Sequence, residues 1–187
     1  MNCQPSRVPT RRRFLHHSAC ALTVAALPWP AQAARAAGPG ARGLAMVHTH
    51  TRERIDLVYA AGAEYDPAAL GALNGFLRDH YSGEVGAIDP TLFDLLHRVQ
   101  RELGSTGPFE VISGYRGEAT NARLRASRGG GVAQRSLHMQ GRAIDVRLPG
   151  VELADLRDAA LVLRGGGVGY YAREQFLHLD TGRVRNW

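Results

Sequence analysis

The chain has 187 residues, of which 44% are hydrophobic, and a formal net charge of +6 at pH 7. This length is enough for one domain with a real core, and no apolar run approaches the roughly 20 residues that a membrane-spanning helix needs. The first 33 residues hold four arginines and no acid, which leaves 19 basic and 17 acidic residues in the rest of the chain. The net charge of that remainder is therefore only +2.

The N-terminus carries the features of an export signal. Residues 10–15 contain a twin arginine followed by Phe-Leu, a mild apolar stretch runs from Ala19 to Leu27, and Ala31-Gln32-Ala33 has the small-x-small pattern of a cleavage site. Together these features predict a twin-arginine signal peptide at residues 1–33 and a periplasmic location. A disordered basic N-terminus is the alternative interpretation.

Both cysteines, Cys3 and Cys20, fall within the predicted signal. The rest of the chain can therefore form no disulfide and no cysteine-ligated metal site. Cys20 would be the modified residue of a lipoprotein signal, but the residues before it lack the leading aliphatic side chain expected of such signals. We therefore favour the twin-arginine interpretation.

After a flexible leader at 34–43, residues 44–187 show mixed helix and strand signals. Runs of apolar and β-branched residues bounded by turns indicate strands. Aspartate-proline pairs ahead of apolar residues at helical spacing indicate helix starts. In chain order the predicted elements are a hairpin of Leu44–His50 and Ile55–Tyr59, helices from Asp66 to about His80 and from Asp89 to near Gly104, a strand at Phe109–Ser113, a helix at Thr120–Arg128, a loop at Gly129–Gly131, a strand at Ala143–Leu148, a helix at Val151–Arg164, a loop at Gly165–Gly167, and paired strands at Val168–Tyr171 and Phe176–Asp180. Without regular βαβ alternation, this predicts an α+β fold: a single compact domain with a small antiparallel sheet flanked by helices.

Strand alternation brings several polar residues to one surface. Asp145 lies opposite the apolar neighbours in its predicted strand, and His178 and Asp180 lie opposite the leucines of theirs. If the apolar residues face the core, these three side chains share the other face, and His138 sits at a loop edge just before the first strand. Two histidines and one carboxylate are zinc ligands, and three protein ligands leave a position open for water, as in catalytic sites.

The alternative is that these three residues bind no metal. In that case Asp145 forms an ion pair with Arg142 or Arg147, and each histidine is a surface residue that forms ordinary hydrogen bonds. Spacing alone leaves both interpretations open.

Four further histidines give no comparable pattern. His48 and His50 lie on the same face of one predicted strand. We interpret them as exposed residues at the edge of the hairpin, because that arrangement is more common than a second metal site. His80 and His97 are placed on predicted helix surfaces.

A family resemblance supports the metal interpretation. Residues 136–145 fit the Ser-x-His-x-x-Gly-x-Ala-x-Asp motif, and the chain resembles the M15 zinc peptidases, which include D-Ala-D-Ala dipeptidases and carboxypeptidases. It is most similar to the murein endopeptidase K branch, which shares the twin-arginine signal, a Ser-Gly-Tyr-Arg segment (here 113–116) and a His-x-Asp-x-Gly-x-Val-Arg-x-Trp ending (here 178–187). The resemblance covers nearly all of the chain after the signal and implies a Hedgehog/D-Ala-D-Ala peptidase-like fold, one zinc ion and peptidoglycan peptides as substrate. The zinc ligands it implies are His138, Asp145 and His178.

The sequence offers two candidates for the general base. Dipeptidases of the wider family place a glutamate three residues before the last ligand, but Gln175 occupies that position here and cannot act as a base. Asp180 shares the strand face of His178 and is the predicted base; Glu174 is the alternative, although it would point to the opposite face.

The remaining site residues are predicted from charge and from the motifs. Arg116 is expected to stabilise the oxyanion, with a structural ion pair as its alternative role. Ser136, Tyr115 and Arg142 are candidates for substrate binding, although Ser136 could instead cap the loop. The excess of arginine around the site suits a carboxylate-rich ligand, with a solvated basic face as the alternative.

These observations predict a zinc-dependent peptidoglycan endopeptidase that hydrolyses peptide crosslinks. The alternatives are a D,D- or L,D-carboxypeptidase acting on muropeptides, and a non-catalytic wall-binding module that contains zinc. An exported protein rarely meets nucleic acid, so no such partner is expected. The absence of a heptad or long amphipathic seam favours a monomer.

Overall fold

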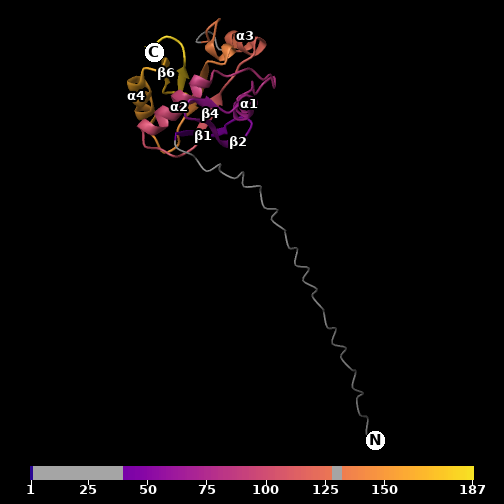
Figure 1. The fold of residues 1–187 in the computed structure, drawn as a ribbon. Coiled ribbons are helices and arrows are strands. Elements are labelled where there is room, and N and C mark those ends of the chain that lie inside the picture. The colour runs from indigo at the N-terminus through magenta and orange to yellow at the C-terminus, as the bar shows by residue number, and fades with distance from the viewer. Residues whose placement is uncertain (2–39, 128–131) are drawn as a thin grey trace. The chain divides into compact units, whose positions relative to one another are not determined.

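The computed structural model describes residue 1, residues 40–127 and residues 132–187 (Figure 1). The predicted signal peptide, the predicted leader up to residue 39 and the predicted loop at 129–131 lie outside the described range. Within that range, no helix is both long enough and apolar enough to span a membrane.

The described residues form one eight-stranded sheet with helices packed on it. The strands are β1 (Ala41–His48), β2 (Arg54–Ala61), β3 (Glu64–Tyr65), β4 (Phe109–Ser113), β5 (Ala143–Arg147), β6 (Gly167–Tyr171), β7 (Phe176–Asp180) and β8 (Arg185–Asn186), in the order β3-β2-β1-β4-β5-β7-β6-β8. The helices are α1 (Pro67–Phe76), α2 (Pro90–Glu102), α3 (Glu118–Ser127), α4 (Leu153–Leu163) and the short 3-10 helix η1 (Leu137–Gln140).

The α+β fold class is confirmed, but the sheet differs from the small antiparallel sheet that was expected. It is mixed, because β1 pairs with β4 and β6 pairs with β8 in parallel. The long connection through α1 and α2 returns the chain beside β1, and only such a crossover permits a parallel pair. Strand β1 also begins at Ala41, so the last three residues of the expected leader belong to the sheet.

The aspartate-proline signals start both predicted helices. The carboxylate of Asp66 accepts hydrogen bonds from backbone amides in the first turn of α1, and Asp89 does the same for α2, which satisfies donors that the helix itself leaves unpaired. Helix α1 ends at Phe76 rather than near His80. Asp79 accepts hydrogen bonds from the backbone amides two and three residues later, and this local turn competes with continued helix.

The core lies between the sheet and helices α1, α2 and α4. Helix α2 packs against β1 and α4, while α4 also contacts β6 and β7 (Figure 1). Alternate residues of β5 and β7 supply the sheet side of this core: Ile144, Val146, Leu177 and Leu179 are all fully buried. The intervening polar residues of these strands are therefore available to the opposite face.

Gly141 links the motif around η1 to the loop before α2. Its φ is 64°, a left-handed conformation that favours glycine. A Cβ at this position would lie 1.9 Å from the Ala87 carbonyl oxygen, and the Gly141 carbonyl accepts a hydrogen bond from the Asp89 amide. The absence of a side chain therefore lets η1 approach the start of α2.

Gly141→Ala is expected to destabilise the protein by about 1–3 kcal/mol, since it combines left-handed strain with a backbone clash. Chemical denaturation would measure this change. Gly71→Ala is the matched control, because an added Cβ on this exposed residue of α1 meets nothing within 4 Å; it should stabilise by about 0.5–1 kcal/mol. Equal effects of the two substitutions would contradict the role of Gly141.

Candidate metal centre

Strands β5 and β7 bring the predicted ligands Asp145 and His178 together. The two residues are directly paired in the antiparallel register, with Ile144 opposite Leu179 one step along. Asp145 Oδ1 lies 2.8 Å from His178 Nδ1. The predicted alternation is therefore confirmed for these strands: the apolar pair enters the core and the polar pair meets on the other face.

His138 completes a triangle of ligand atoms. Its Nε2 lies 3.2 Å from His178 Nδ1 and 3.3 Å from Asp145 Oδ1. Two ligands bound about 2 Å from a tetrahedral zinc ion are separated by roughly 3.3 Å. Both distances from His138 match this separation, and the 2.8 Å between Asp145 and His178 is the shorter distance of a direct hydrogen bond. Within the described residues, this is the one group of three or more His, Cys, Asp and Glu side chains whose ligand atoms lie within 4.8 Å of one another.

The other ring nitrogen of each histidine is held by a second partner. His138 Nδ1 donates to the Gly114 carbonyl at 2.8 Å, and His178 Nε2 donates to Asp180 Oδ2 at 3.2 Å. These bonds leave His138 Nε2 and His178 Nδ1 facing the centre. Metal-ligating histidines commonly have such partners, which set the tautomer and the ring orientation. The donor set and its surroundings thus fit a zinc ion.

Asp180 lies behind His178 instead of beside the open side of the triangle. It is fully buried. Besides His178, its carboxylate accepts hydrogen bonds from the backbone amides of Gly167 and Gly182 and from both terminal nitrogens of Arg185, at 3.1 and 2.7 Å. This placement does not fit the predicted role of general base, because the oxygens are already occupied and face away from the reacting position.

Electrostatics keep the carboxylates of this region ionised. Burial alone would raise the pKa of Asp145, but the two neighbouring histidines hold it well below its ordinary value. Burial opposes the charged form of His178, yet hydrogen bonds to Asp145 and Asp180 raise the pKa of that imidazole to about 9. In the metal-free protein His178 therefore carries a proton where a metal ion would bind.

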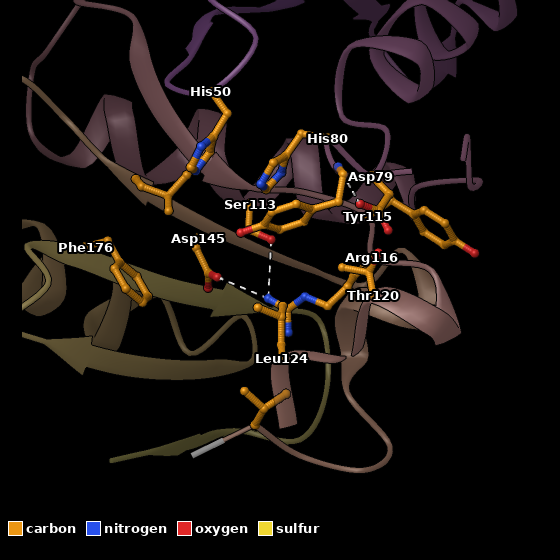
Figure 2. Close-up of a pocket in the computed structure, with 13 residues that line it drawn as sticks. His50, Asp79, His80, Ser113, Tyr115, Arg116, Thr120, Leu124, Asp145 and Phe176 are labelled. Atoms are coloured by element: carbon orange, nitrogen blue, oxygen red, sulfur yellow. Dashed lines mark hydrogen bonds and ion pairs between the residues drawn. The ribbon is translucent and has the colours of Figure 1, made fainter. Parts of the chain in front are cut away.

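The Ser-Gly-Tyr-Arg segment supports the centre from β4. Gly114 supplies the carbonyl that orients His138, and the Arg116 amide donates to the His138 carbonyl at 3.2 Å. The Arg116 guanidinium lies 3.7 Å from Asp145 Oδ2 and donates to the Ser113 hydroxyl at 3.3 Å (Figure 2). A bulge in the pairing of β4 with β5 falls just before Ser113, and bulges commonly re-aim side chains beside functional sites.

Two cavities meet at Asp145 and extend toward opposite edges of the sheet. The smaller, about 100 Å³, lies toward β1 and β4 and is lined by His50, His80, Tyr115 and Arg116 among others (Figure 2). The larger, about 250 Å³, lies toward β6 and β8. Its walls include Ser136, His138, His178, Arg185 and Trp187. Arg116 and Asp145 line both cavities, so the centre opens on both sides.

The predicted substrate-binding residues separate into two groups. Tyr115 lines the smaller cavity, with its hydroxyl donating to Glu84 at 3.0 Å. Ser136 lines the larger one and makes no side-chain capping bond to η1. Arg142 lines neither: its guanidinium donates to the hydroxyl and the carbonyl of Thr181. These bonds hold the Arg142 side chain away from both cavities, so nothing in this structure supports its predicted contact with substrate.

The alternative base, Glu174, also lies away from the cavities. It is an exposed residue of the turn between β6 and β7 and lines neither cavity. Neither carboxylate considered from the sequence is thus placed to take a proton from an attacking water.

Two of the histidines that were interpreted as surface residues are buried or half-buried in the structure. His48 is fully buried and His80 is half-buried in the turn after α1, whereas His50 is exposed as predicted. The interpretation of His48 as a hairpin-edge surface residue and of His80 as a helix-surface residue is therefore wrong. Trp187 was also missed as a wall residue; its ring lies 5.3 Å from that of His178, and only its place in the ending motif could have pointed to it.

An α+β domain that brings two histidines and an aspartate together at an open cation site has the architecture of a metal-dependent peptidase. The family described as "Peptidoglycan L,D-endopeptidase MepK" matches residues 36–187, and the chain belongs to this family of M15 peptidases. It is 44% identical over 177 residues to the peptidoglycan L,D-endopeptidase MepK of Escherichia coli strain K12, covering 95% of this chain and 96% of that protein. It is 39% identical over 179 residues to the probable peptidoglycan L,D-endopeptidase MepK of Haemophilus influenzae, covering 95% of each.

Proposed function

We propose that this protein is a zinc-dependent peptidoglycan L,D-endopeptidase that opens peptide crosslinks in the cell wall. The convergence of His138, Asp145 and His178 carries this proposal, because it provides a three-ligand site with room for a water molecule. The family and its curated relatives, which are named as endopeptidases acting on peptidoglycan, supply the substrate class.

The protein groups around the centre have separable roles. When bound, the zinc ion would polarise the scissile carbonyl and activate a water molecule. Arg116 borders both cavities, which supports a role in binding the developing oxyanion. Asp180 fixes the ring of His178, and the Gly114 carbonyl fixes that of His138. Tyr115 lines the smaller cavity and Ser136 the larger one, which supports contacts between these residues and the peptide.

The two-sided groove favours an endopeptidase over a carboxypeptidase. A carboxypeptidase needs to accommodate only one residue beyond the scissile bond, whereas an endopeptidase needs space for chain on both sides. Cavities of about 100 and 250 Å³ extend from Asp145 in opposite directions along the sheet.

Digestion of purified sacculi tests the proposal directly. With the zinc-loaded protein, mass spectrometry of the fragments should show loss of crosslinked dimers without release of single terminal residues. Release of single residues with crosslinks intact would indicate a carboxypeptidase. Intact sacculi in the presence of bound zinc would instead indicate a wall-binding module.

Zinc binding should release a proton near neutral pH. The pKa of His178 in the metal-free protein is raised to about 9 from an ordinary 6.5, so the stabilisation from its charged form is complete below about pH 6.5 and is lost as the pH rises through about 9. Zinc must displace this proton, so its affinity should rise about tenfold per pH unit between about pH 7 and 9. Titration calorimetry at pH 7 in two buffers of different ionisation enthalpy should show about one proton released; zero release would contradict the assignment.

We also propose export by the twin-arginine route to the periplasm, as a monomer. The support is the twin arginine, apolar stretch and small-x-small site within residues 1–33. Replacing Arg11 and Arg12 by lysine should leave the precursor inside the cell. Fractionation followed by immunoblotting would measure this, and an unchanged periplasmic yield would refute the signal.

A further inference from the structure

Three histidines outside the metal centre gather at the smaller cavity. The rings of His50 and His80 are stacked, with centroids 4.1 Å apart and planes within 4° of parallel. His48 packs edge-on against both, at 5.9 and 5.4 Å. Figure 2 shows His50 and His80 side by side on one side of the cavity, with Asp145 and Arg116 on the other.

The sheet places this cluster at a fixed interval from the metal centre. The end of β1 pairs with β4 (His48 with Val111), and β4 pairs with β5 (Ser113 with Asp145). Neighbouring strands lie about 4.8 Å apart, so about 10 Å separates the backbones of β1 and β5. His50 follows β1 by two residues, which puts it level with Ser113 and Asp145 along the sheet.

The carboxylates near the centre are not available to accept a proton. Among the described residues that line the two cavities, the carboxylates are Asp79 and Asp145. Asp145 belongs to the metal triangle. Asp79 is buried and accepts hydrogen bonds from the amides of Gly117 and Tyr81, both at 2.9 Å. The arginines have no lone pair for a proton, and tyrosine hydroxyls are weak acceptors.

Of the two lining histidines outside the triangle, His50 is the accessible one. The ring of His50 is exposed, whereas the Nε2 atom of His80 is buried and has no hydrogen-bond partner among the described residues. The His50 amide donates to His48 Nδ1 at 3.2 Å, which fixes the turn that presents the ring. A proton-transfer group must be accessible to the attacking water, and of these two histidines His50 is the exposed one.

The two rings that pack against His50 carry no charge at physiological pH. Burial, followed by the influence of neighbouring histidines, lowers the pKa of His48 and of His80 to about 4, so neither ring adds a positive charge beside the cavity.

We propose that His50 is the residue that transfers the proton during amide hydrolysis, and that His80 positions it by stacking. This inference rests on the proposed endopeptidase function. One proton of the attacking water moves to a nitrogen of His50 while the water oxygen forms the bond to the carbonyl carbon. The carbon–nitrogen bond then breaks, and the same proton passes to the leaving amine, so the imidazole returns to its neutral state and a carboxylic acid and an amine are released.

The test compares His50→Gln with the full wild-type enzyme on the same crosslinked muropeptide. His50→Gln should lower kcat by about 10²–10⁴-fold, the usual contribution of a general base, with unchanged zinc content by elemental analysis and unchanged thermal stability. His97→Gln, a partly buried histidine that lines neither cavity, should keep wild-type activity. Imidazole added to His50→Gly should restore part of the lost rate, since the exposed site is open to solvent.

The outcomes separate a failure of the proposed function from a failure of the role of His50. An inactive wild-type enzyme with bound zinc overturns the proposed function and this inference with it. An active wild type together with His50→Gln within about threefold of it overturns the inference alone, as does loss of zinc in His50→Gln. His80→Phe, which keeps a flat ring, should retain most of kcat while His80→Ala loses it; equal losses in the two variants would overturn the positioning role.

Discussion

His138→Ala is expected to abolish both zinc binding and muropeptide cleavage. The substitution removes one of three ligand atoms, and the remaining pair of Asp145 and His178 already forms a 2.8 Å hydrogen bond that competes with the metal. Loss of a residue that merely orients a ligand costs about 10–100-fold in metal affinity, so loss of the ligand itself should exceed that range. Zinc content after dialysis and cleavage rate are the two measurements.

His97→Ala is the matched control for this experiment. His97 is a partly buried histidine on α2 whose Nδ1 lies 3.2 Å from the Gly43 carbonyl oxygen, and it lines neither cavity. It should keep one zinc ion and full activity. A His138→Ala protein that still held zinc and cleaved muropeptides would remove the basis of the hydrolase assignment.

Asp180→Asn is expected to weaken zinc binding about 10–100-fold and to destabilise the protein by about 1–3 kcal/mol, since it leaves hydrogen-bond donors around a buried side chain without their charged acceptor. The fully buried carboxylate accepts from His178 and from both terminal nitrogens of Arg185. Burial would raise the pKa of Asp180, but these hydrogen bonds keep it well below its ordinary value. The side-chain amide of asparagine has one acceptor oxygen instead of two. Its NH₂ group would face N–H groups that now donate to Asp180, so some of these hydrogen bonds would be lost.

Zinc dependence distinguishes positioning from base catalysis in this variant. If Asp180 positions His178, excess zinc should restore most of kcat to Asp180→Asn. If Asp180 were the base, kcat would stay low at saturating zinc while the zinc affinity stayed normal. Asp158→Asn provides the control, because this aspartate is exposed and pairs only with its neighbour Arg157 in a contact of little energetic value.

The alternation argument succeeded for Asp145 and His178 because it depends on a local property. In any strand flanked by apolar residues, burying those residues turns the intervening side chain to the other face. The antiparallel pairing of β5 and β7 then set the two ligands opposite each other. The helix starts at Asp66 and Asp89 were predictable for the same reason, since capping involves residues within one turn.

The same argument could not assign a role to Asp180. Strand alternation correctly grouped it with His178, but a shared face says nothing about depth or partners. The amide of Gly167 and the side chain of Arg185 approach Asp180 from β6 and β8, and β8 is too short to show a periodicity of its own. The surroundings of Asp180 could not be predicted because they consist of tertiary contacts.

Long-range contacts also explain why the surroundings of His80 and Arg142 were not predicted from the sequence. His80 was expected on a helix surface, but α1 ends four residues earlier and the turn carries its ring onto that of His50, thirty residues away in sequence. Arg142 was expected near the substrate, but Thr181 at the end of β7 captures its guanidinium. No local pattern encodes either pairing.

The amino-acid sequence by itself determined the α+β class and the starts of the main helices, because strand alternation and helix capping each depend on residues within a few positions of one another. Two separate short motifs, at 136–145 and 178–187, also pointed to His138, Asp145 and His178 as a set suited to zinc. Only the tertiary structure decided which nitrogen of each histidine faces the centre, that Asp180 supports His178 from behind, and that His50 and His80 lie beside the cavity. Those features depend on hydrogen bonds and ring contacts between strands and turns that are distant in the chain. Such partners are selected by the packing of the whole sheet, so they become visible only once the fold is known.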